Sequence, residues 1–413
     1  MNHGARIEFL ISALSNYIER KGPADRFISY VYKNNRFIGS RDRQFINLHF
    51  YSILRKYLML EYLCKDDYRL QVFSYLIITG FCDIDGLDEL CSEEQYTPYR
   101  LEDREIEFLN NVEKIADNAP DNIKANLPEW LYKKLSNIDG SDVLFNYLLK
   151  EAPLDIRANT LKTNKDEVKN LLKKEGIDSK IIESTDNGIR IANRVSLSTL
   201  DIHKNGFFEI QDAGSQNIAK LINAKPGDKI MDFCAGACGK SLAFAPYMNG
   251  KGKIVCCDIS KNRLDQGKKR LKRAGVFNAE CRLLDSENNT WLKRQKGKFN
   301  KVLVDAPCSG TGTIRRNPDK VISISEDMID SLILEQEEII KKASLMVSPG
   351  GYLVYATCSM LVEENENQIN KFLENNNDFS LEKFNGEESS MINYYPHKND
   401  CDGFFIANMR KKS

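Results

Sequence analysis

The chain has 413 residues, of which 42% are hydrophobic and 29% are charged, and its formal net charge at pH 7 is zero. These values are typical of a globular protein with two or three domains. The eleven cysteines lack the spacing of a disulfide framework, and the first residues lack the pattern of a secretory leader. No apolar run approaches the roughly 20 residues that cross a bilayer, so we expect a cytoplasmic protein with free thiols and no membrane partner.

Charge is unevenly distributed along the chain although it sums to zero. Basic residues outnumber acidic residues in segments 1–60 and 261–301, whereas acidic residues dominate segment 81–120. The two basic segments could bind the phosphates of a nucleic acid. Lysines that merely solvate helix faces would produce the same pattern, so charge alone leaves both interpretations open.

Residues 1–140 place apolar side chains at helical spacing, as in segments 7–14 and 45–54. The second of these segments follows Gly39-Ser40-Arg41-Asp42-Arg43, which has the pattern of a turn and then the first residues of a helix. We therefore predict an all-helical amino-terminal domain. Its basic, arginine-rich face suits RNA binding and suits the docking of a protein equally well.

Residues 150–205 predict a small α/β subdomain beside a larger one. Segment 157–163 has strand character, a helix is expected over about 165–176, and short strands are expected at 181–182 and 189–191.

From residue 206 to residue 413, strands and helices alternate regularly. The predicted strands are 229–233, 253–257, 280–284, 301–305, 351–356 and 403–409. This alternation predicts an α/β fold with a doubly wound, mostly parallel sheet.

The first strand of the predicted sheet runs into a loop of small residues that precedes a helix. A P-loop would need a glycine where Cys234 stands, and a dinucleotide-binding loop would need more glycines than Gly236 and Gly239. A loop that binds S-adenosylmethionine tolerates this looser spacing. The loop therefore favours S-adenosylmethionine among the nucleotide-type cofactors.

The ends of the next three predicted strands carry acidic residues, Asp258, Asp285 and Asp305. Carboxylates at these positions can accept hydrogen bonds from a ribose and from an adenine edge. Three carboxylates would repel a triphosphate, whereas an adenosyl ligand that is neutral or cationic suits them. Any one of these aspartates could instead be a helix cap, but the set of three favours a cofactor site.

Two cysteines follow the ends of two later strands, Cys308 after strand 301–305 and Cys358 after strand 351–356. The carboxyl ends of parallel strands line the ligand crevice of an open sheet. We therefore expect both thiols and the carboxylate of Asp305 to meet in one cleft, as a reaction site.

The other cysteines do not predict a metal site. Cys234, Cys238, Cys256 and Cys257 lack paired Cys-x-x-Cys spacing and lie on strands or in a tight loop. Cys64, Cys82, Cys91, Cys281 and Cys401 are expected to be packing residues.

Residues 150–413 resemble the Sun/Fmu family of RNA cytosine-5 methyltransferases, and within it the subgroup that acts on bacterial 16S ribosomal RNA. Seven segments carry the resemblance in family order: Arg157–Lys162, Gln211–Gln216, Asp232–Gly236, Asp305–Gly312, Arg315–Asp319, Tyr355–Ser359 and Asp402–Ala407. The helical amino-terminal part resembles, more weakly, the NusB-type RNA-binding domain, through Ser40-Arg41-Asp42-Arg43.

The resemblance implies a Rossmann-like class I methyltransferase fold and methyl transfer from S-adenosylmethionine to C5 of a cytosine. In the family, the cysteine that matches Cys358 is the nucleophile, and the one that matches Cys308 helps to release the product. Asp305 and Lys240 complete the implied catalytic set. The implied cofactor contacts are Cys234, Ala235, Gly236, Ala237, Cys238, Gly239, Lys240, Asp258, Arg263, Asp285 and Asp305. The expected RNA contacts are Arg157, Asn159, Arg315, Arg316 and the basic segment 261–301.

The cofactor loop departs from the family pattern at one point. The family usually has Pro-Gly-Gly-Lys, whereas this chain has Ala237-Cys238-Gly239-Lys240. A cysteine in place of a glycine puts a Cβ atom where the backbone can require a glycine-like conformation.

This departure keeps a second function open, an RNA-binding assembly factor that retains the fold without turnover. A DNA methyltransferase is disfavoured because the catalytic region has no large target-recognition insert. We expect an RNA partner, 16S ribosomal RNA or a ribosomal assembly intermediate, and no obligatory protein partner.

Overall fold

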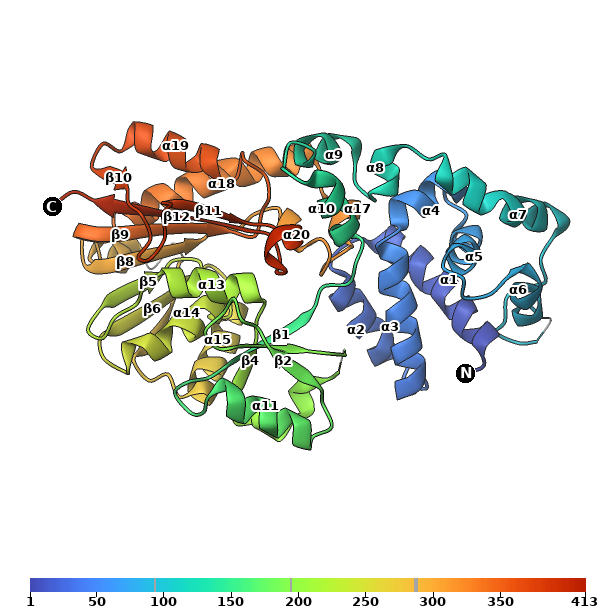
Figure 1. The fold of residues 1–413 in the computed structure, drawn as a ribbon, viewed down its shortest axis with the longest axis horizontal. Helices are drawn as coiled ribbons and strands as arrows, with labels where there is room; N and C mark the ends of the chain where they lie inside the picture. Colours follow the sequence, from blue (N-terminus) through green and yellow to red (C-terminus); the bar gives the residue numbers. More distant parts are fainter. Residues whose placement is uncertain (93, 194, 286–288) are drawn as a thin grey trace. The chain divides into compact units, whose positions relative to one another are not determined.

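The computed structural model describes residues 1–92, 94–193, 195–285 and 289–413, and these residues form two compact units (Figure 1). The helical unit comprises Met1–Glu151 and Ile314–Ser325. The sheet unit comprises Ala152–Thr313 and Glu326–Ser413. Among the described residues, no helix combines the length and the apolar character needed to span a membrane.

The amino-terminal part is all-helical, as predicted. Its helices are α1 (His3–Arg20), α2 (Ala24–Asn34), α3 (Ser40–Leu54), α4 (Tyr57–Cys64), α5 (Tyr68–Ile78), α6 (Ile84–Leu90), α7 (Asp103–Asp117), α8 (Asp121–Lys124), α9 (Glu129–Leu135) and α10 (Ser141–Leu148). Local caps fix several of the helix starts; Asn2, for example, accepts a hydrogen bond from the amide of Ala5 at 2.7 Å. The apolar stripes of these helices meet in one core around Leu10, Phe50 and Phe73.

A segment from much later in the chain completes the helical unit. Ile314–Ser325, which includes α17 (Lys320–Ser323), leaves the sheet unit after Thr313. The Asp319 carboxylate accepts a hydrogen bond from the amide of Ala24 at 3.2 Å, and Ile322 packs against the helical core. The sequence does not predict this discontinuity, because no change in composition or periodicity marks residue 314.

The sheet unit begins with a small antiparallel sheet of strand order β2-β3-β1-β4. Its elements are β1 (Leu154–Ala158), α11 (Lys165–Lys174), β2 (Ser179–Ile181), β3 (Gly188–Ile191), a 3-10 turn η1 (Leu197–Thr199), α12 (Asp201–Lys204) and β4 (Phe208–Ile210). The strand β4 lies beyond residue 205, where we had placed the end of this subdomain. The strand β4 belongs to the small sheet because it pairs with β1, and local residues do not predict that pairing.

The larger sheet follows the predicted alternation. Its remaining elements are α13 (Ala213–Leu221), β5 (Lys229–Asp232), α14 (Gly239–Phe244), η2 (Ala245–Met248), β6 (Lys253–Asp258), α15 (Lys261–Ala274), β7 (Ala279–Leu283), α16 (Asn289–Lys293), β8 (Phe299–Asp305), η3 (Thr311–Thr313), α18 (Glu326–Ser344), β9 (Val347–Thr357), α19 (Glu366–Asn375), β10 (Phe379–Leu381), β11 (Met391–Tyr394), α20 (Pro396–Asn399) and β12 (Phe404–Lys411). Within the described residues, the strand order is β10-β12-β9-β8-β5-β6-β7, and β11 pairs with β12.

The doubly wound α/β class is confirmed. Strands β7, β6, β5, β8 and β9 are parallel, and β12 is antiparallel to β9. Helices α13, α14 and α15 cover one face of this sheet, and α18 and α19 cover the other (Figure 1). The order of the strands reverses between β5 and β8, and ligands bind at such a switch point, outside the carboxyl ends of the strands.

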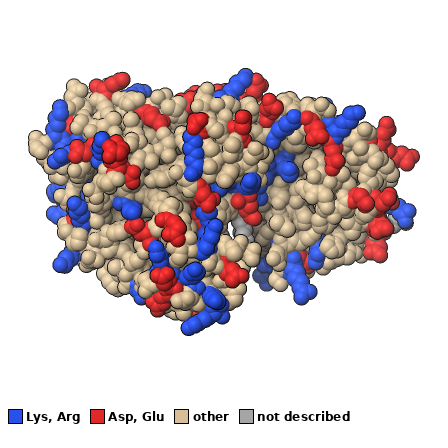
Figure 2. Space-filling model, in the orientation of Figure 1, with Lys and Arg blue, Asp and Glu red and all other residues tan. Residues whose placement is uncertain are grey.

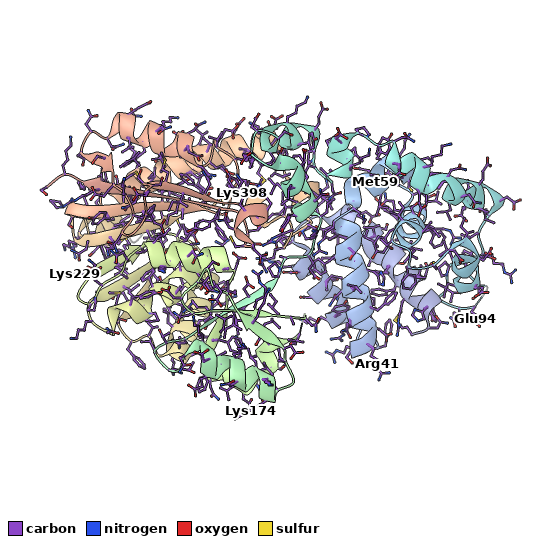
Figure 3. The ribbon with its side chains drawn as sticks, in the orientation of Figure 1. Arg41, Met59, Glu94, Lys174, Lys229 and Lys398 are labelled. Carbon is purple, nitrogen blue, oxygen red and sulfur yellow. The ribbon has the colours of Figure 1, made fainter. Side chains whose placement is uncertain are left out.

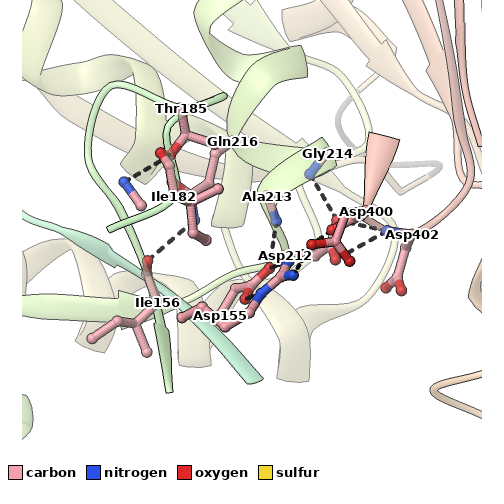
Figure 4. Close-up of polar contacts among 12 residues, drawn as sticks. Asp155, Ile156, Ile182, Thr185, Asp212, Ala213, Gly214, Gln216, Asp400 and Asp402 are labelled. Atoms are coloured by element: carbon pink, nitrogen blue, oxygen red, sulfur yellow. Dashed lines mark hydrogen bonds and ion pairs between the residues drawn. The ribbon is translucent and has the colours of Figure 1, made fainter. Parts of the chain in front are cut away.

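Buried polar contacts attach the small sheet to the larger one (Figure 4). The carboxylate of Asp155 on β1 accepts a hydrogen bond from the amide of Ala213 at 3.3 Å. The side chain of Gln216 on α13 donates to the carbonyl of Ile156 at 3.2 Å. Asp212 accepts from the amide of Asp402, just before β12. These contacts join three segments that are far apart in the sequence.

The loop that follows Cys308 makes a close backbone contact that only glycine allows. The amide of Gly403 donates to the carbonyl of Gly312 at 2.7 Å, and a Cβ atom on Gly312 would lie 2.1 Å from the carbonyl oxygen of Gly403. This contact places the Cys308 loop against the start of β12.

We expect Gly312→Ala to destabilise the sheet unit by about 1–3 kcal/mol or more, because the two backbones must separate to admit the methyl group. Thermal unfolding followed by near-ultraviolet circular dichroism measures this change. Gly39→Ala is the matched control, since a Cβ atom at Gly39 meets only an ordinary contact at 3.6 Å. Equal melting temperatures for the two variants would contradict the prediction.

Candidate functional site

A cavity of about 850 Å³ opens at the carboxyl ends of the parallel strands, within the sheet unit. The loops after β5, β6, β7, β8 and β9 all contribute to its lining. The predicted residues that line it are Cys234, Ala235, Gly236, Ala237, Asp258, Arg263, Asp285, Asp305, Cys308 and Cys358. The fold thus brings together residues that are more than one hundred positions apart in the sequence.

The cofactor loop, residues 234–240, is tied to the end of β6. The amide of Gly236 donates to the carboxylate of Asp258 at 2.8 Å, and the amide of Ser260 donates to the same carboxylate at 2.7 Å. Gly236 has a φ of +52°, which a glycine adopts without strain. Asp258 therefore shapes the loop as well as lining the cavity.

Cys238 stands at a left-handed backbone position, with φ +62° and ψ +30°. Cys238 stands where the family usually has a glycine, and the expected glycine-like conformation is confirmed. A residue with a Cβ atom pays roughly 1–2 kcal/mol for this conformation. Its side chain is fully buried and does not line the cavity.

Lys240 and Asp305 form an ion pair beside the cavity. The Nζ atom of Lys240 donates to Oδ2 of Asp305 at 2.5 Å, and Lys240 is only 7% exposed. Burial acts to lower the pKa of Lys240, but the charge and hydrogen bond of Asp305 outweigh it and raise the pKa above its usual value. Lys240 is therefore cationic at neutral pH, and its ammonium holds the Asp305 carboxylate in one orientation.

The two predicted thiols meet. Strands β8 and β9 are parallel neighbours with Asp305 opposite Ala356, so the loops that follow them emerge side by side. The Sγ atoms of Cys308 and Cys358 are 3.3 Å apart. The hydrogen bond to Cys358, together with burial, raises the pKa of Cys308 well above its usual value. Cys308 is therefore a neutral thiol at neutral pH.

A buried carboxylate that sequence reasoning missed connects the two cysteine loops. Glu364 has no exposed surface, and it accepts hydrogen bonds from the amide of Ser309 at 2.8 Å and its hydroxyl at 2.5 Å. It also accepts from the hydroxyl of Ser359 at 2.5 Å and from the side chain of Gln336 at 3.0 Å. Ser309 follows Cys308 and Ser359 follows Cys358, so one carboxylate positions both thiols.

The sequence around Glu364 does not predict this role. The segment Glu363-Glu364-Asn365-Glu366 carries three carboxylates and has the composition of a solvated loop before a helix. Only the packing of this loop distinguishes Glu364, which is buried, from Glu363 and Glu366, which are partly exposed.

The structure gives three expected RNA contacts a different role. Arg157 is 5% exposed, Asn159 is 3% exposed and Arg315 is 2% exposed. Arg157 donates to Gln211 at 2.8 Å, and burial lowers its pKa to about 10. Asn159 donates to the carbonyls of Gly206 and Ala274, at 2.8 Å each. Buried side chains engaged within the protein cannot reach RNA phosphates in this conformation.

Some of the remaining expected RNA contacts are exposed and others are not. Arg316 is half-buried in the helical unit. In the basic segment 261–301, Arg270 and Arg273 are engaged by the buried carboxylate of Glu209, while four lysines of α15 are exposed: Lys261, Lys268, Lys269 and Lys272. Residues 286–288 of this segment lie outside the described residues.

Charge on the face drawn in Figure 2 is mixed rather than gathered into one basic patch. Arg41, from the motif that suggested an RNA-binding helical domain, is exposed at the start of α3 (Figure 3). An exposed arginine there is compatible with either of the two interpretations of the helical domain.

We expect Glu364→Ala to lower the free energy of unfolding by roughly 3 kcal/mol or more, because each buried donor left without an acceptor costs about 1–3 kcal/mol. Denaturant titration measures the change. Glu374→Ala, which removes an exposed carboxylate from α19, is the control and should change stability by less than about 0.5 kcal/mol. The structural role of Glu364 is refuted if both variants unfold at the same denaturant concentration.

Comparisons with known proteins identify the family of this chain. Residues 219–410 match the family described as 16S rRNA methyltransferase RsmB/F, and residues 127–198 match the ferredoxin-like domain of RsmF/B-like methyltransferases. The solved structure of PH0851 aligns with a TM-score of 0.80 and 25% identity, covering 100% of this chain and 99% of that one.

Two curated relatives are each called ribosomal RNA small subunit methyltransferase B. The protein from Photorhabdus laumondii is 33% identical over 291 residues, which cover 69% of this chain and 66% of that protein. The protein from an Enterobacter species is 31% identical over 313 residues, which cover 74% of this chain and 72% of that protein. The match to the first relative thus spans slightly less than two thirds of its length. On this similarity, the chain belongs to the RsmB/F family of 16S rRNA methyltransferases.

Proposed function

We propose that this protein transfers a methyl group from S-adenosylmethionine to C5 of a cytosine in RNA, and that its substrate is 16S ribosomal RNA. The observation that carries the proposal is the meeting of two thiols, 3.3 Å apart, with the Lys240–Asp305 ion pair at one cavity. Membership of the RsmB/F family supports the choice of ribosomal RNA. Such a substrate implies a cytoplasmic location.

The cavity suits the adenosyl part of the cofactor. Ile259 and Leu284 supply apolar walls for a flat ring, and Asp258 and Asp285 supply acceptors at the strand ends. The carboxylate oxygens of Asp258 accept hydrogen bonds from Gly236 and Ser260, and each keeps capacity for a ribose hydroxyl. When bound, S-adenosylmethionine supplies the methyl group from its sulfonium centre.

The thiols have distinct roles in the proposed reaction. C5 of cytosine is too weakly nucleophilic to take a methyl group until a thiolate adds to C6 and makes C5 enamine-like. Cys358 is the attacker, because Cys308 remains a neutral thiol. The ammonium of Lys240 interacts electrostatically with Cys358, and a nearby cation stabilises a thiolate.

The later steps restore the aromatic ring. Asp305, oriented by Lys240, accepts a hydrogen bond from the N4 amino group of the base, and the ammonium of Lys240 offsets the negative charge that the ring gains when the thiolate adds. Once the methyl group is on C5, the C5 proton passes to a base and the bond between C6 and the sulfur of Cys358 breaks. Cys308 lies beside that sulfur and assists its departure.

The RNA must present its target base unstacked, at a cost of a few kcal/mol unless the base lies in a loop. The exposed lysines of α15, Lys261, Lys268, Lys269 and Lys272, are the phosphate contacts in this proposal. They replace the buried Arg157, Asn159 and Arg315 in that role.

We expect Cys358→Ala to abolish methyl transfer to an RNA fragment, and Cys308→Ala to leave a covalent protein–RNA adduct. The first variant lacks the attacking sulfur, and the second lacks the thiol that assists its release. Transfer of labelled methyl groups measures the activity, and denaturing gel electrophoresis detects the adduct. Cys257→Ala, a buried thiol on the other face of the sheet, is the control. If only Cys358→Ala trapped an adduct, the two roles would be exchanged.

We also expect a map of 5-methylcytosine in 16S ribosomal RNA to lose a site when the gene is deleted. Bisulfite sequencing of RNA from cells with and without the gene provides the map. Calorimetry with S-adenosylmethionine separates this function from the alternative, an assembly factor without turnover, which the strained Cys238 in the cofactor loop would favour. An unchanged map together with no measurable cofactor binding would establish that alternative.

A further inference from the structure

Three thiols outside the reaction site converge beneath the cofactor loop. Cys256 on β6 and Cys281 on β7 are direct partners in the parallel register, so their side chains lie on the same face of the sheet. Cys238 reaches this face from the loop before α14. The Sγ atoms of the three residues all lie within 4.8 Å of one another, and those of Cys238 and Cys281 are 3.9 Å apart.

The separation of 3.9 Å between Cys238 and Cys281 is close to the sulfur–sulfur distance in a thiolate metal site. Zinc binds cysteine sulfur at about 2.3 Å, so two sulfurs in a tetrahedral site lie about 3.8 Å apart. Small side-chain adjustments would bring the remaining sulfur pairs to this distance. Soft sulfur ligands select zinc or copper(I) over hard cations such as magnesium.

The three cysteines pack in an apolar core, but their surroundings show features that packing alone does not require. Cys238 adopts a left-handed conformation that is costly for a residue with a Cβ atom. Helix α15 accommodates its sulfur through Gly267, where a Cβ atom would lie 2.5 Å from the Cys238 Sγ atom. Ser241 adds an oxygen at the edge of the cluster, and its hydroxyl accepts a hydrogen bond from Cys256 at 3.2 Å.

Access and charge are also suitable. Cys238 and Cys256 have no exposed surface, whereas Cys281 is partly exposed and offers an entry path. The ammonium of Lys268 lies near Cys281, and the two groups interact electrostatically. The guanidinium of Arg270 donates to the carbonyl of Ala237, the residue before Cys238, at 2.8 Å, so a second cation lies close to the cluster.

We propose that Cys238, Cys256 and Cys281 together bind one thiophilic d¹⁰ cation, with Zn²⁺ as its representative, and that this ion fixes the cofactor loop to β6 and β7. Water completes the coordination on the side of Cys281. Binding replaces the thiol protons, which pass to the buffer, and no oxidation takes place. The sequence spacing had indicated no metal site, because the three ligands lie 18 and 25 positions apart and only strand pairing unites them.

The test uses the full chain carrying Cys308→Ala and Cys358→Ala, since the reactive thiol pair could itself bind zinc. This double variant is stripped with a chelator under reducing conditions and titrated with Zn²⁺ against a chromophoric competitor. We expect one tightly bound Zn²⁺ per chain, confirmed by elemental analysis. Adding Cys281→Ser should weaken Zn²⁺ binding by about 100-fold or more, because even changes outside the ligand set cost about 10–100-fold.

Two further variants make the result decisive. Cys257→Ala removes the thiol next to Cys256 that faces the other side of the sheet, and it should bind Zn²⁺ as the parent does. Cys238→Gly removes a ligand while relieving the left-handed backbone, and it should lose binding with its fold intact. Zn²⁺ should raise the melting temperature of the parent and of Cys257→Ala only. The proposal is overturned if the parent binds no Zn²⁺, or if Cys281→Ser and Cys238→Gly bind it as tightly as the parent.

Discussion

The carboxylate of Glu364 is buried between two loops and accepts hydrogen bonds from Ser309 and Ser359, which follow Cys308 and Cys358. A buried carboxylate is tolerated only when such bonds replace its hydration. Here they have a second effect, since they lock Ser309 to Ser359 and thereby bring Cys308 and Cys358 to 3.3 Å. The geometry of the reaction site depends on this one group, which itself touches neither thiol in the proposed chemistry.

The cysteines of this protein differ in role according to the residues that surround them. Cys308 and Cys358 sit at strand ends, beside a cavity and near the ammonium of Lys240. Cys257 lies on a strand interior among apolar side chains and is a packing residue. Cys238, together with Cys256 and Cys281, occupies a third environment, in which sulfurs face one another away from the cavity. Nothing in the residues themselves separates these three groups.

The charges of the sheet unit are used mainly for internal positioning. Lys240 orients Asp305, and Glu209 engages Arg270 and Arg273 of α15. Arg270 in turn contacts the backbone of the cofactor loop at Ala237. A basic segment that looks uniform in the sequence is thus divided between arginines that hold the fold and lysines that remain exposed to solvent.

Sequence patterns were sufficient for features that depend on neighbouring residues. The alternation of strands and helices, the acids at the ends of β6 and β8, and the thiols beyond β8 and β9 follow from local periodicity and from the polarity of a parallel sheet. Features that depend on distant partners were not accessible. The burial of Arg157 and Arg315, the pairing of β4 with β1, and the inclusion of 314–325 in the helical unit are set by contacts across long stretches of chain. The same holds for Glu364 and for the three-thiol cluster, because burial and convergence arise only when separate segments pack together.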